Sequence, residues 1–186
     1  MRTLVMRVSD YSLDGVVAVE DTDYFEFCRD LPDDQERLDR TRAFYEAADL
    51  HIMGRNSYEG MARYFPTATD HPYADAMNAG RKAVFSRSLT TADWANTVIV
   101  AGDLTEEIDR LKQDGTGYIV AHGGIGFWQS LIRLDLPDEY HLSVFPYLAG
   151  HGRRLFDVLE KSPPLELAAS TAFSNGTVDL QYRRRR

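Results

Sequence analysis

Short apolar runs and amphipathic segments alternate along the first two thirds of the chain. The apolar runs have the length of buried strands and occupy residues 3–8, 50–53, 82–86, 97–101 and 118–121. Segments with apolar residues at helical spacing lie at 33–48, at 56–64, behind the cap residue Asp103 and behind Gly123-Gly124. Strands that alternate with helices in this way predict an α/β domain whose strands are largely parallel.

Three stretches between these elements carry weaker signals. Residues 16–19 are short and apolar, which fits either a strand or an extended edge. Residues 21–34 are polar and contain a proline, so we expect mostly loop with a short turn of helix at 23–28. Residues 65–80 contain prolines and a closing glycine and are also expected to be loop.

The last third of the chain has a different pattern. Residues 138–146 alternate between apolar and polar side chains, as a half-buried strand does. Two further runs, 165–173 and 177–183, flank Asn175-Gly176. Asn-Gly between two strand-like runs is a strong signal for a tight hairpin. The predicted sheet is therefore mixed, with parallel strands in the middle and an antiparallel hairpin at one edge.

The composition is that of one globular domain spanning residues 1–186. The length of 186 residues is close to the prior of about 150 residues per domain. A single cysteine, Cys28, excludes an internal disulfide. No apolar run approaches the roughly 18 residues of a membrane span, and the first residues lack the apolar core of a signal peptide. We therefore expect a cytoplasmic protein without membrane contact.

The formal net charge of −8 disfavours general binding to nucleic acid, because that affinity depends on Lys and Arg neutralising phosphates. A phosphate-bearing ligand would need a local site that works against the overall negative charge. The expected partner is consequently a small molecule and not a nucleic acid.

Three strand ends carry residues suited to such a site, and ligands of open α/β sheets bind at the carboxyl ends of strands. The first motif is Gly54, Arg55, Asn56 and Ser57, the second is Ser86 and Arg87, and the third is Gly123, Gly124, Ile125 and Gly126. Glycine-rich turns into helices let backbone amides meet a phosphate. Each motif alone is also explained by an ordinary helix start or strand end. Together they favour a nucleotide cofactor, and the two arginines suit a terminal monophosphate, as in NADP.

Five segments together resemble the dihydrofolate reductase-like superfamily, and most closely its riboflavin-biosynthesis branch, the C-terminal reductase domain of bifunctional deaminase–reductases. They are SLDGVVA (12–18), MGRNSYEGM (53–61), KAVFSRSL (82–89), HGGIGFWQSL (122–131) and DEYHLSVFPYLAGHGRRLF (138–156). The resemblance extends from residue 3 to about 183. It implies a three-layer α/β/α fold, NADPH as cofactor and a homodimer. The zinc motif of the deaminase half is absent from the chain.

The resemblance also implies roles for the three motifs. The first motif matches the glycine, arginine and first turn of the cofactor-binding helix. The second matches the serine and arginine at the adenosine 2′-phosphate. The third matches the glycine pair and helix start beneath the pyrophosphate.

The substrate side is less defined by the sequence. Residues 21–34 lack the pattern that precedes the pterin-binding carboxylate of dihydrofolate reductases. Asp14 is our candidate for the catalytic, substrate-side carboxylate, with Tyr24 and Phe25 as substrate-binding walls. An ordinary turn residue beside Gly15 explains Asp14 equally well. The five histidines show no metal-ligand spacing, so no metal site is predicted.

These observations favour an NADPH-dependent reductase of a small heterocyclic substrate, resembling the reductase of 5-amino-6-(5-phosphoribosylamino)uracil. Two alternatives remain at this stage. One is a dihydrofolate reductase, and the other is a non-catalytic module that binds NADPH without turnover.

Overall fold

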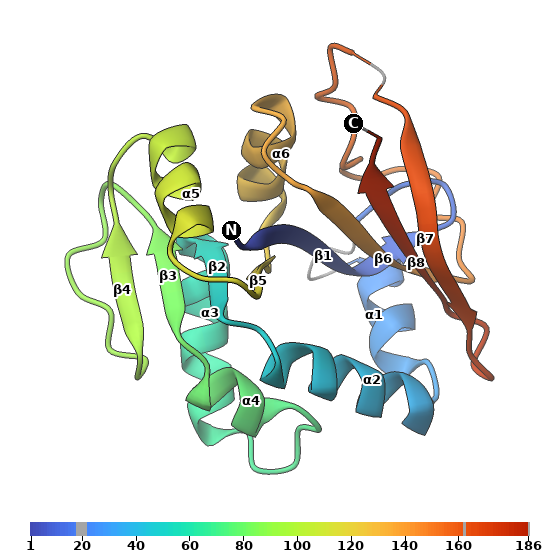
Figure 1. Cartoon of the computed structure of the whole chain (residues 1–186). Helices are drawn as coiled ribbons and strands as arrows, with labels where there is room; N and C mark the ends of the chain where they lie inside the picture. The colour runs from blue at the N-terminus through green and yellow to red at the C-terminus, as the bar shows by residue number, and fades with distance from the viewer. Residues whose placement is uncertain (18–21, 162, 186) are drawn as a thin grey trace.

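One mixed sheet forms the centre of the computed structural model, which describes residues 1–17, 22–161 and 163–185 (Figure 1). The strands of this described part are β1 (Thr3–Ser12), β2 (Leu50–Gly54), β3 (Lys82–Phe85), β4 (Thr97–Val100), β5 (Tyr118–Ala121), β6 (Glu139–Phe145), β7 (Leu165–Ala172) and β8 (Val178–Arg184). Their order across the sheet is β4-β3-β2-β5-β1-β6-β8-β7.

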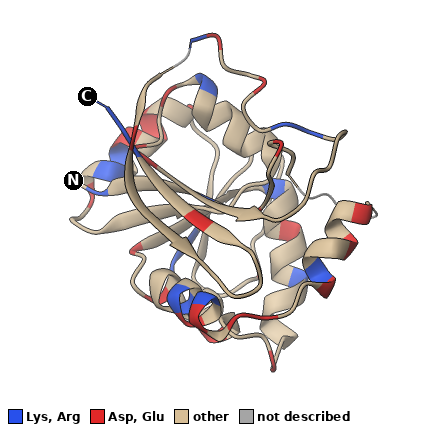
Figure 2. Ribbon diagram, turned by 90° about the vertical axis from the view of Figure 1, so that its right-hand side faces the viewer, with Lys and Arg blue, Asp and Glu red and all other residues tan. Residues whose placement is uncertain are grey.

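Strands β4 to β6 in that order pair in parallel, and β8 pairs antiparallel with both β6 and β7. The hairpin β7–β8 turns at the predicted Asn175-Gly176, where Gly176 has a φ of +85°. Its two strands form the side of the molecule that faces the viewer in Figure 2. The predicted α/β class, with a mostly parallel sheet and antiparallel C-terminal strands, is confirmed.

Helices cover both faces of the sheet and complete the three layers (Figure 1). The helices of the described part are α1 (Asp23–Asp30), α2 (Gln35–Glu46), α3 (Arg55–Tyr64), α4 (Ala74–Ala79), α5 (Leu104–Gln113) and α6 (Ile125–Arg133). Helices α5 and α6 pack on one face through Ile108, Leu131 and their neighbours. Helices α2, α3 and α4 pack on the other face through Tyr45, Tyr58 and Met77.

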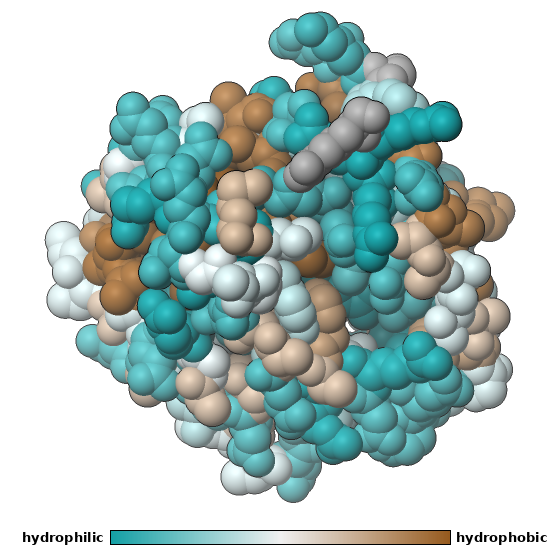
Figure 3. All heavy atoms as spheres, viewed as in Figure 1, coloured by the Kyte–Doolittle hydropathy of each residue, from teal (hydrophilic) through white to brown (hydrophobic). Residues whose placement is uncertain are grey.

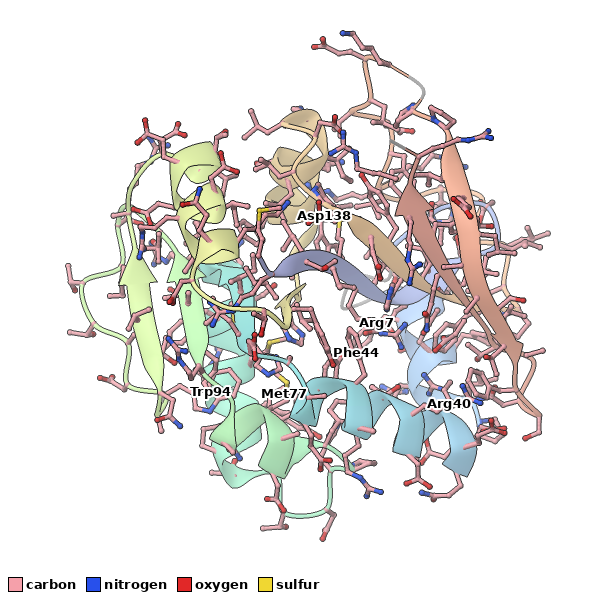
Figure 4. All side chains as sticks on the ribbon, in the orientation of Figure 1. Arg7, Arg40, Phe44, Met77, Trp94 and Asp138 are labelled. Carbon is pink, nitrogen blue, oxygen red and sulfur yellow. The ribbon has the colours of Figure 1, made fainter. Side chains whose placement is uncertain are left out.

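Side chains alternate between the two faces along each strand and therefore contribute to both cores. Leu4, Met6 and Val8 of β1 point to the core under α5 and α6, whereas Val84 and Val120 point to the core under α2, α3 and α4. Arg7 therefore lies on the α2 side of β1, and Figure 4 places it close to Phe44 of α2. Each face of the sheet buries apolar side chains, which supplies the main stabilisation of the fold.

Two predicted loops contain helices. Residues 23–30 form α1, longer than the turn expected at 23–28, because the Thr22 hydroxyl accepts a hydrogen bond from the Phe25 amide at 3.2 Å and caps the helix. The 65–80 prediction was wrong in part, since it contains a 3₁₀ turn (Phe65–Thr67) and α4. Burial of Ala74, Ala76 and Met77 stabilises α4, a tertiary effect that local composition does not reveal.

The stretch 16–19, predicted to be a strand or an extended edge, lies only partly within the described residues. Val16 and Val17 form isolated bridges to Arg154 and Tyr11, respectively. Residues 18 and 19 lie outside the described part of the chain.

The face of the molecule shown in Figure 3 is largely hydrophilic. Acidic and basic residues are interspersed along the helices in Figure 2, and apolar residues are scattered over the face in Figure 3. No helix within the described ranges is long and apolar enough to cross a membrane.

Candidate cofactor and substrate site

The starts of α3 and α6 meet at the carboxyl edge of the sheet. Strands β2 and β5 are neighbours, and each leads directly into one of these helices. The Gly54 amide donates a hydrogen bond to the Gly123 carbonyl oxygen at 2.9 Å, which ties the two turns together. The first and third motifs of the sequence therefore form one site.

Neither of these two helix starts has a side-chain cap. Their N-cap residues are Gly54 and Gly124, whereas the side chains of Thr22, Asp34 and Asp103 cap α1, α2 and α5. The first amides of a helix point outward and carry its positive dipole end. Two uncapped starts side by side offer these amides to an anionic ligand.

Close packing explains the glycines at this junction. A Cβ on Gly54 would lie 3.0 Å from the Phe127 Cβ, and one on Gly124 would lie 3.1 Å from the Ser57 hydroxyl oxygen. Gly123 has a φ of +99°, a conformation that side chains disfavour. The bare backbone thus keeps the cradle between the two helices open for a ligand to approach.

The second motif joins this site through Arg55. Its guanidinium donates to the Ser88 hydroxyl at 2.9 Å and to the Glu59 carboxylate at 2.6 Å. The Ser86 hydroxyl accepts from the Ser88 and Leu89 amides at 3.2 and 3.0 Å and so orders the loop after β3. Arg87 is exposed beside them. The two arginines that the sequence identified come from neighbouring strand ends.

A cavity of about 690 Å³ extends from these helix starts along the α2 face of β1. Four residues of the predicted cofactor-binding motifs line this cavity: Asn56, Ser57, Gly124 and Ile125. The polar groups in the rest of its wall include Arg7, Asp10, Arg37, Tyr73, His122 and Arg153. One continuous space therefore connects the predicted cofactor site with a set of ionisable side chains.

The sequence analysis did not identify Asp10 or Arg37. Neither side chain forms an ion pair or hydrogen bond within the described residues, and the Nε of Arg37 is buried without a partner. Burial raises the pKa of Asp10, and the nearby charges of Arg37 and Arg7 oppose this shift. A charged residue near the end of an otherwise buried strand was the available sequence signal.

Asp14 has the contacts of a turn residue. Its carboxylate accepts from the Ser12 hydroxyl at 2.7 Å and from the Ala149 and Gly150 amides at 2.9 and 2.8 Å. These hydrogen bonds, that of Ser12 first, lower the pKa of Asp14 to about 2. Asp14 is not among the residues that line the cavity, so the geometry favours the turn alternative.

Tyr24 and Phe25 also lie away from the cavity lining. Tyr24 is buried and stacks on Tyr147 with a centroid distance of 5.0 Å. Phe25 is half-buried in the first turn of α1. Cys28 of helix α1 lines the cavity.

His122, which lines the cavity, contacts a second histidine, His51. The Nδ1 of His51 lies 2.7 Å from the Nε2 of His122, and both rings are buried. Burial, with the charge of Lys82, lowers the pKa of His51 to about 4. Burial and the neighbouring His51 lower the pKa of His122 well below its usual value. Both imidazoles are therefore neutral at pH 7.

Comparison with known proteins connects this geometry to a family. The model of the RibD C-terminal domain matches residues 3–178. A putative riboflavin biosynthesis protein from Shewanella sp. PV-4 has a similar structure, with a TM-score of 0.78, 25% identity and full coverage of both chains. The Bacillus subtilis protein YyaP, described as uncharacterized, is 27% identical over 143 residues, which cover 75% of this chain and 76% of YyaP.

More distant structures share the fold. Enterococcus faecalis dihydrofolate reductase, solved as a complex with NADP(H), has a TM-score of 0.64 at 15% identity, with 99% of this chain and 97% of that chain covered. A deaminase/5-amino-6-(5-phosphoribosylamino)uracil reductase from Thermotoga maritima has a TM-score of 0.67 at 15% identity, with 99% of this chain and 57% of that chain covered. The extent of the family match decides the assignment: this chain belongs to the RibD C-terminal domain family.

Proposed function

We propose that the protein is an NADPH-dependent reductase of a small heterocyclic substrate of the ribosylaminopyrimidine type. The observation that carries the proposal is the pair of uncapped helix starts behind Gly54 and Gly124. Their residues Ser57 and Gly124 line the same cavity as Asp10 and Arg37. Membership of the RibD C-terminal domain family supports a reductase.

The junction between α3 and α6 fits a dinucleotide. The amides that follow Gly54 and Gly124 would hold the pyrophosphate, because both helix starts lack side-chain caps and a Cβ would crowd the cradle. Arg55 and Arg87 would hold a 2′-phosphate, with the Ser88 hydroxyl orienting Arg55. Bound NADPH supplies a hydride, and the residues of this chain position the acceptor.

The remainder of the cavity fits a polar substrate with an anionic group. Arg37 and Arg153 line it, and their side chains make no ion pair within the described residues. The Arg37 guanidinium lies over the Phe145 ring, 5.6 Å from its centroid. A guanidinium that makes no ion pair within the protein can bind a phosphate or carboxylate of a ligand. The 5-phosphoribosylamino group named for the Thermotoga maritima protein has this chemistry.

Thermal unfolding of the purified chain with NADPH and with NADH tests the cofactor. Saturation at 100 times the dissociation constant should stabilise the fold by about 2.7 kcal/mol. We expect this shift at much lower concentrations of NADPH than of NADH. A chain that responds to neither nucleotide would refute the proposed function.

The same preparation, incubated with NADPH, tests the substrate class. We expect NADPH to be oxidised in the presence of 5-amino-6-(5-phosphoribosylamino)uracil and not in the presence of dihydrofolate. Turnover of dihydrofolate together with tight methotrexate binding would instead identify a dihydrofolate reductase. Binding of NADPH without oxidation by either compound would identify a binding module.

A further inference from the structure

Strand β1 contains a bulge that determines where Asp10 points. Val8 pairs with Leu142 and Tyr11 with Val144, so three steps along β1 match two along β6. Val8 and Tyr11 both pack toward the core under α5 and α6. Without the bulge, Asp10 would share that face with Val8. The extra residue turns Ser9 and Asp10 toward the cavity, which both of them line.

The bulge also places Asp10 near the cofactor end of the cavity. Met6 pairs with Ala121, the last residue of β5, so Asp10 lies beyond the end of β5, at the edge where Gly123 and Gly124 turn into α6. Residues Ser57, Gly124 and Asp10 therefore line one space. A substrate that contacts a nicotinamide there would be within the same cavity as the Asp10 carboxyl group.

The carboxyl group of Asp10 has no hydrogen-bond or ion-pair partner within the described residues. This contrasts with Asp14, which accepts hydrogen bonds from one hydroxyl and two amides. The ionisable groups whose charges act on Asp10 or respond to it are Arg7 of β1, Arg37 of α2, Tyr24 and Cys28 of α1, and Tyr73. A half-buried carboxyl group without a protein partner is available to a ligand.

We propose that Asp10 is the catalytic acid of this site, which protonates the substrate nitrogen as hydride is delivered to the adjacent carbon. The inference rests on the proposed reductase function. In the ring-opened form of a ribosylamine, the C1′–O4′ bond has broken and the amine proton has passed to the ring oxygen, which leaves a C=N bond. The π bond of this C=N group breaks, a C–H bond forms with the NADPH hydride, and an N–H bond forms with the Asp10 proton. NADPH becomes NADP⁺, the substrate gains two hydrogens, and the Asp10 carboxylate regains its proton from solvent.

Other acidic groups of the wall suit this role less well. Tyr73 is a weak acid because burial raises its pKa. Burial likewise raises the pKa of Cys28 to about 12. Asp33 lines the cavity from an exposed position, where its carboxylate is solvated. For Asp10, burial favours the protonated form, as a general acid requires.

The test compares Asp10→Asn with Asp109→Asn, an exposed carboxylate of α5 on the opposite face of the sheet. Asparagine keeps the shape of the side chain and removes the proton. Single-turnover hydride transfer at saturating NADPH should fall about 100- to 10,000-fold in Asp10→Asn. The wild-type rate should decline tenfold per pH unit above the pKa of Asp10, and the residual rate of Asp10→Asn should be independent of pH. Asp109→Asn should behave as wild type.

Two substrate-free measurements separate this proposal from the proposed function. Affinity for NADPH should be unchanged in Asp10→Asn. Carboxyl carbon NMR of ¹³C-aspartate-labelled protein should show one resonance, missing in Asp10→Asn, that titrates above the ordinary value of about 3.9 and shifts when NADPH is added.

The outcomes are distinct. A wild type that transfers hydride while Asp10→Asn keeps its rate and pH profile would refute the acid role alone. An Asp10 resonance that titrates at or below the ordinary value would also refute it. A wild type that binds NADPH and reduces no substrate would refute the proposed function, and the acid role with it.

Discussion

The guanidinium Nη1 of Arg55 donates a hydrogen bond to the hydroxyl oxygen of Ser88 at 2.9 Å. This bond connects the start of α3 with the loop after β3, so two motifs that are separate in the sequence form one exposed cationic corner beside Arg87. In an acidic chain with a net charge of −8, we expect this corner to be the local site for a phosphate.

Replacing Arg55 or Arg87 by Ala tests this corner. Each change should weaken NADPH binding by about 10- to 100-fold, because a hydrogen bond to a charged group contributes about 1.5–3 kcal/mol. NADH lacks the 2′-phosphate, so its affinity should change little. Calorimetric titration with both nucleotides measures the difference. Arg110→Ala, an exposed arginine of α5, is the control, and equal losses for NADPH and NADH would remove the 2′-phosphate assignment.

Two glycines of the same helix region distinguish ligand access from helix stability. Gly54→Ala would bring its Cβ to 3.0 Å from the Phe127 Cβ, whereas a Cβ on Gly60 meets nothing within 4 Å. We expect Gly54→Ala to weaken NADPH binding and lower the melting temperature. Gly60→Ala should retain binding and stabilise the fold by about 0.5–1 kcal/mol, because Gly60 is inside α3. Equal NADPH affinity in both variants would show that close packing at Gly54 is not needed for NADPH binding.

Asp14→Asn separates the turn role from a catalytic one. The change weakens the acceptor for the Ala149 and Gly150 amides, so the melting temperature at pH 7 should fall. Since the pKa of Asp14 is lowered to about 2, the stabilisation is present above the unfolded-state pKa and lost as pH falls through the folded value. The rate of hydride transfer should remain. If Asp14→Asn kept its melting temperature and lost hydride transfer, the result would support a catalytic role for Asp14.

The buried histidines predict a loss of stability in mild acid. Burial lowers the pKa of His51 to about 4 and that of His122 further, while unfolded histidines titrate near 6.5. Below about pH 6.5 the unfolded chain therefore binds more protons than the folded chain, and the free energy of unfolding decreases as pH falls. Each such imidazole contributes a slope of about 1.4 kcal/mol per pH unit.

Urea titrations between pH 5 and pH 6.5 measure this slope. His51→Leu should reduce this slope by about 1.4 kcal/mol per pH unit, the contribution of one imidazole, whatever the variant's absolute stability. Leu148→Ala, at an exposed position without a titratable side chain, should leave the slope unchanged. An identical slope in His51→Leu and wild type would show that His51 does not titrate on unfolding.

Local signals in the sequence predicted much of the fold. Asn175-Gly176 identified the hairpin, and Asp103 identified the start of α5, because both depend on short-range geometry. Helix α4 was missed, since burial against the sheet and not local pattern stabilises it. Asp10 was missed because strict alternation assigns it to the face of Val8, and the bulge exists only through the pairing of β1 with β6.

Transfer of deuterium tests the central claim most directly. The wild-type chain is incubated with NADPH carrying deuterium at the transferable C4 position and with 5-amino-6-(5-phosphoribosylamino)uracil, and the product is examined by mass spectrometry. The proposed function predicts a reduced product that contains one deuterium per NADPH oxidised. Saturable NADPH binding with no deuterium in any reduced product would contradict it and identify the chain as a nucleotide-binding module.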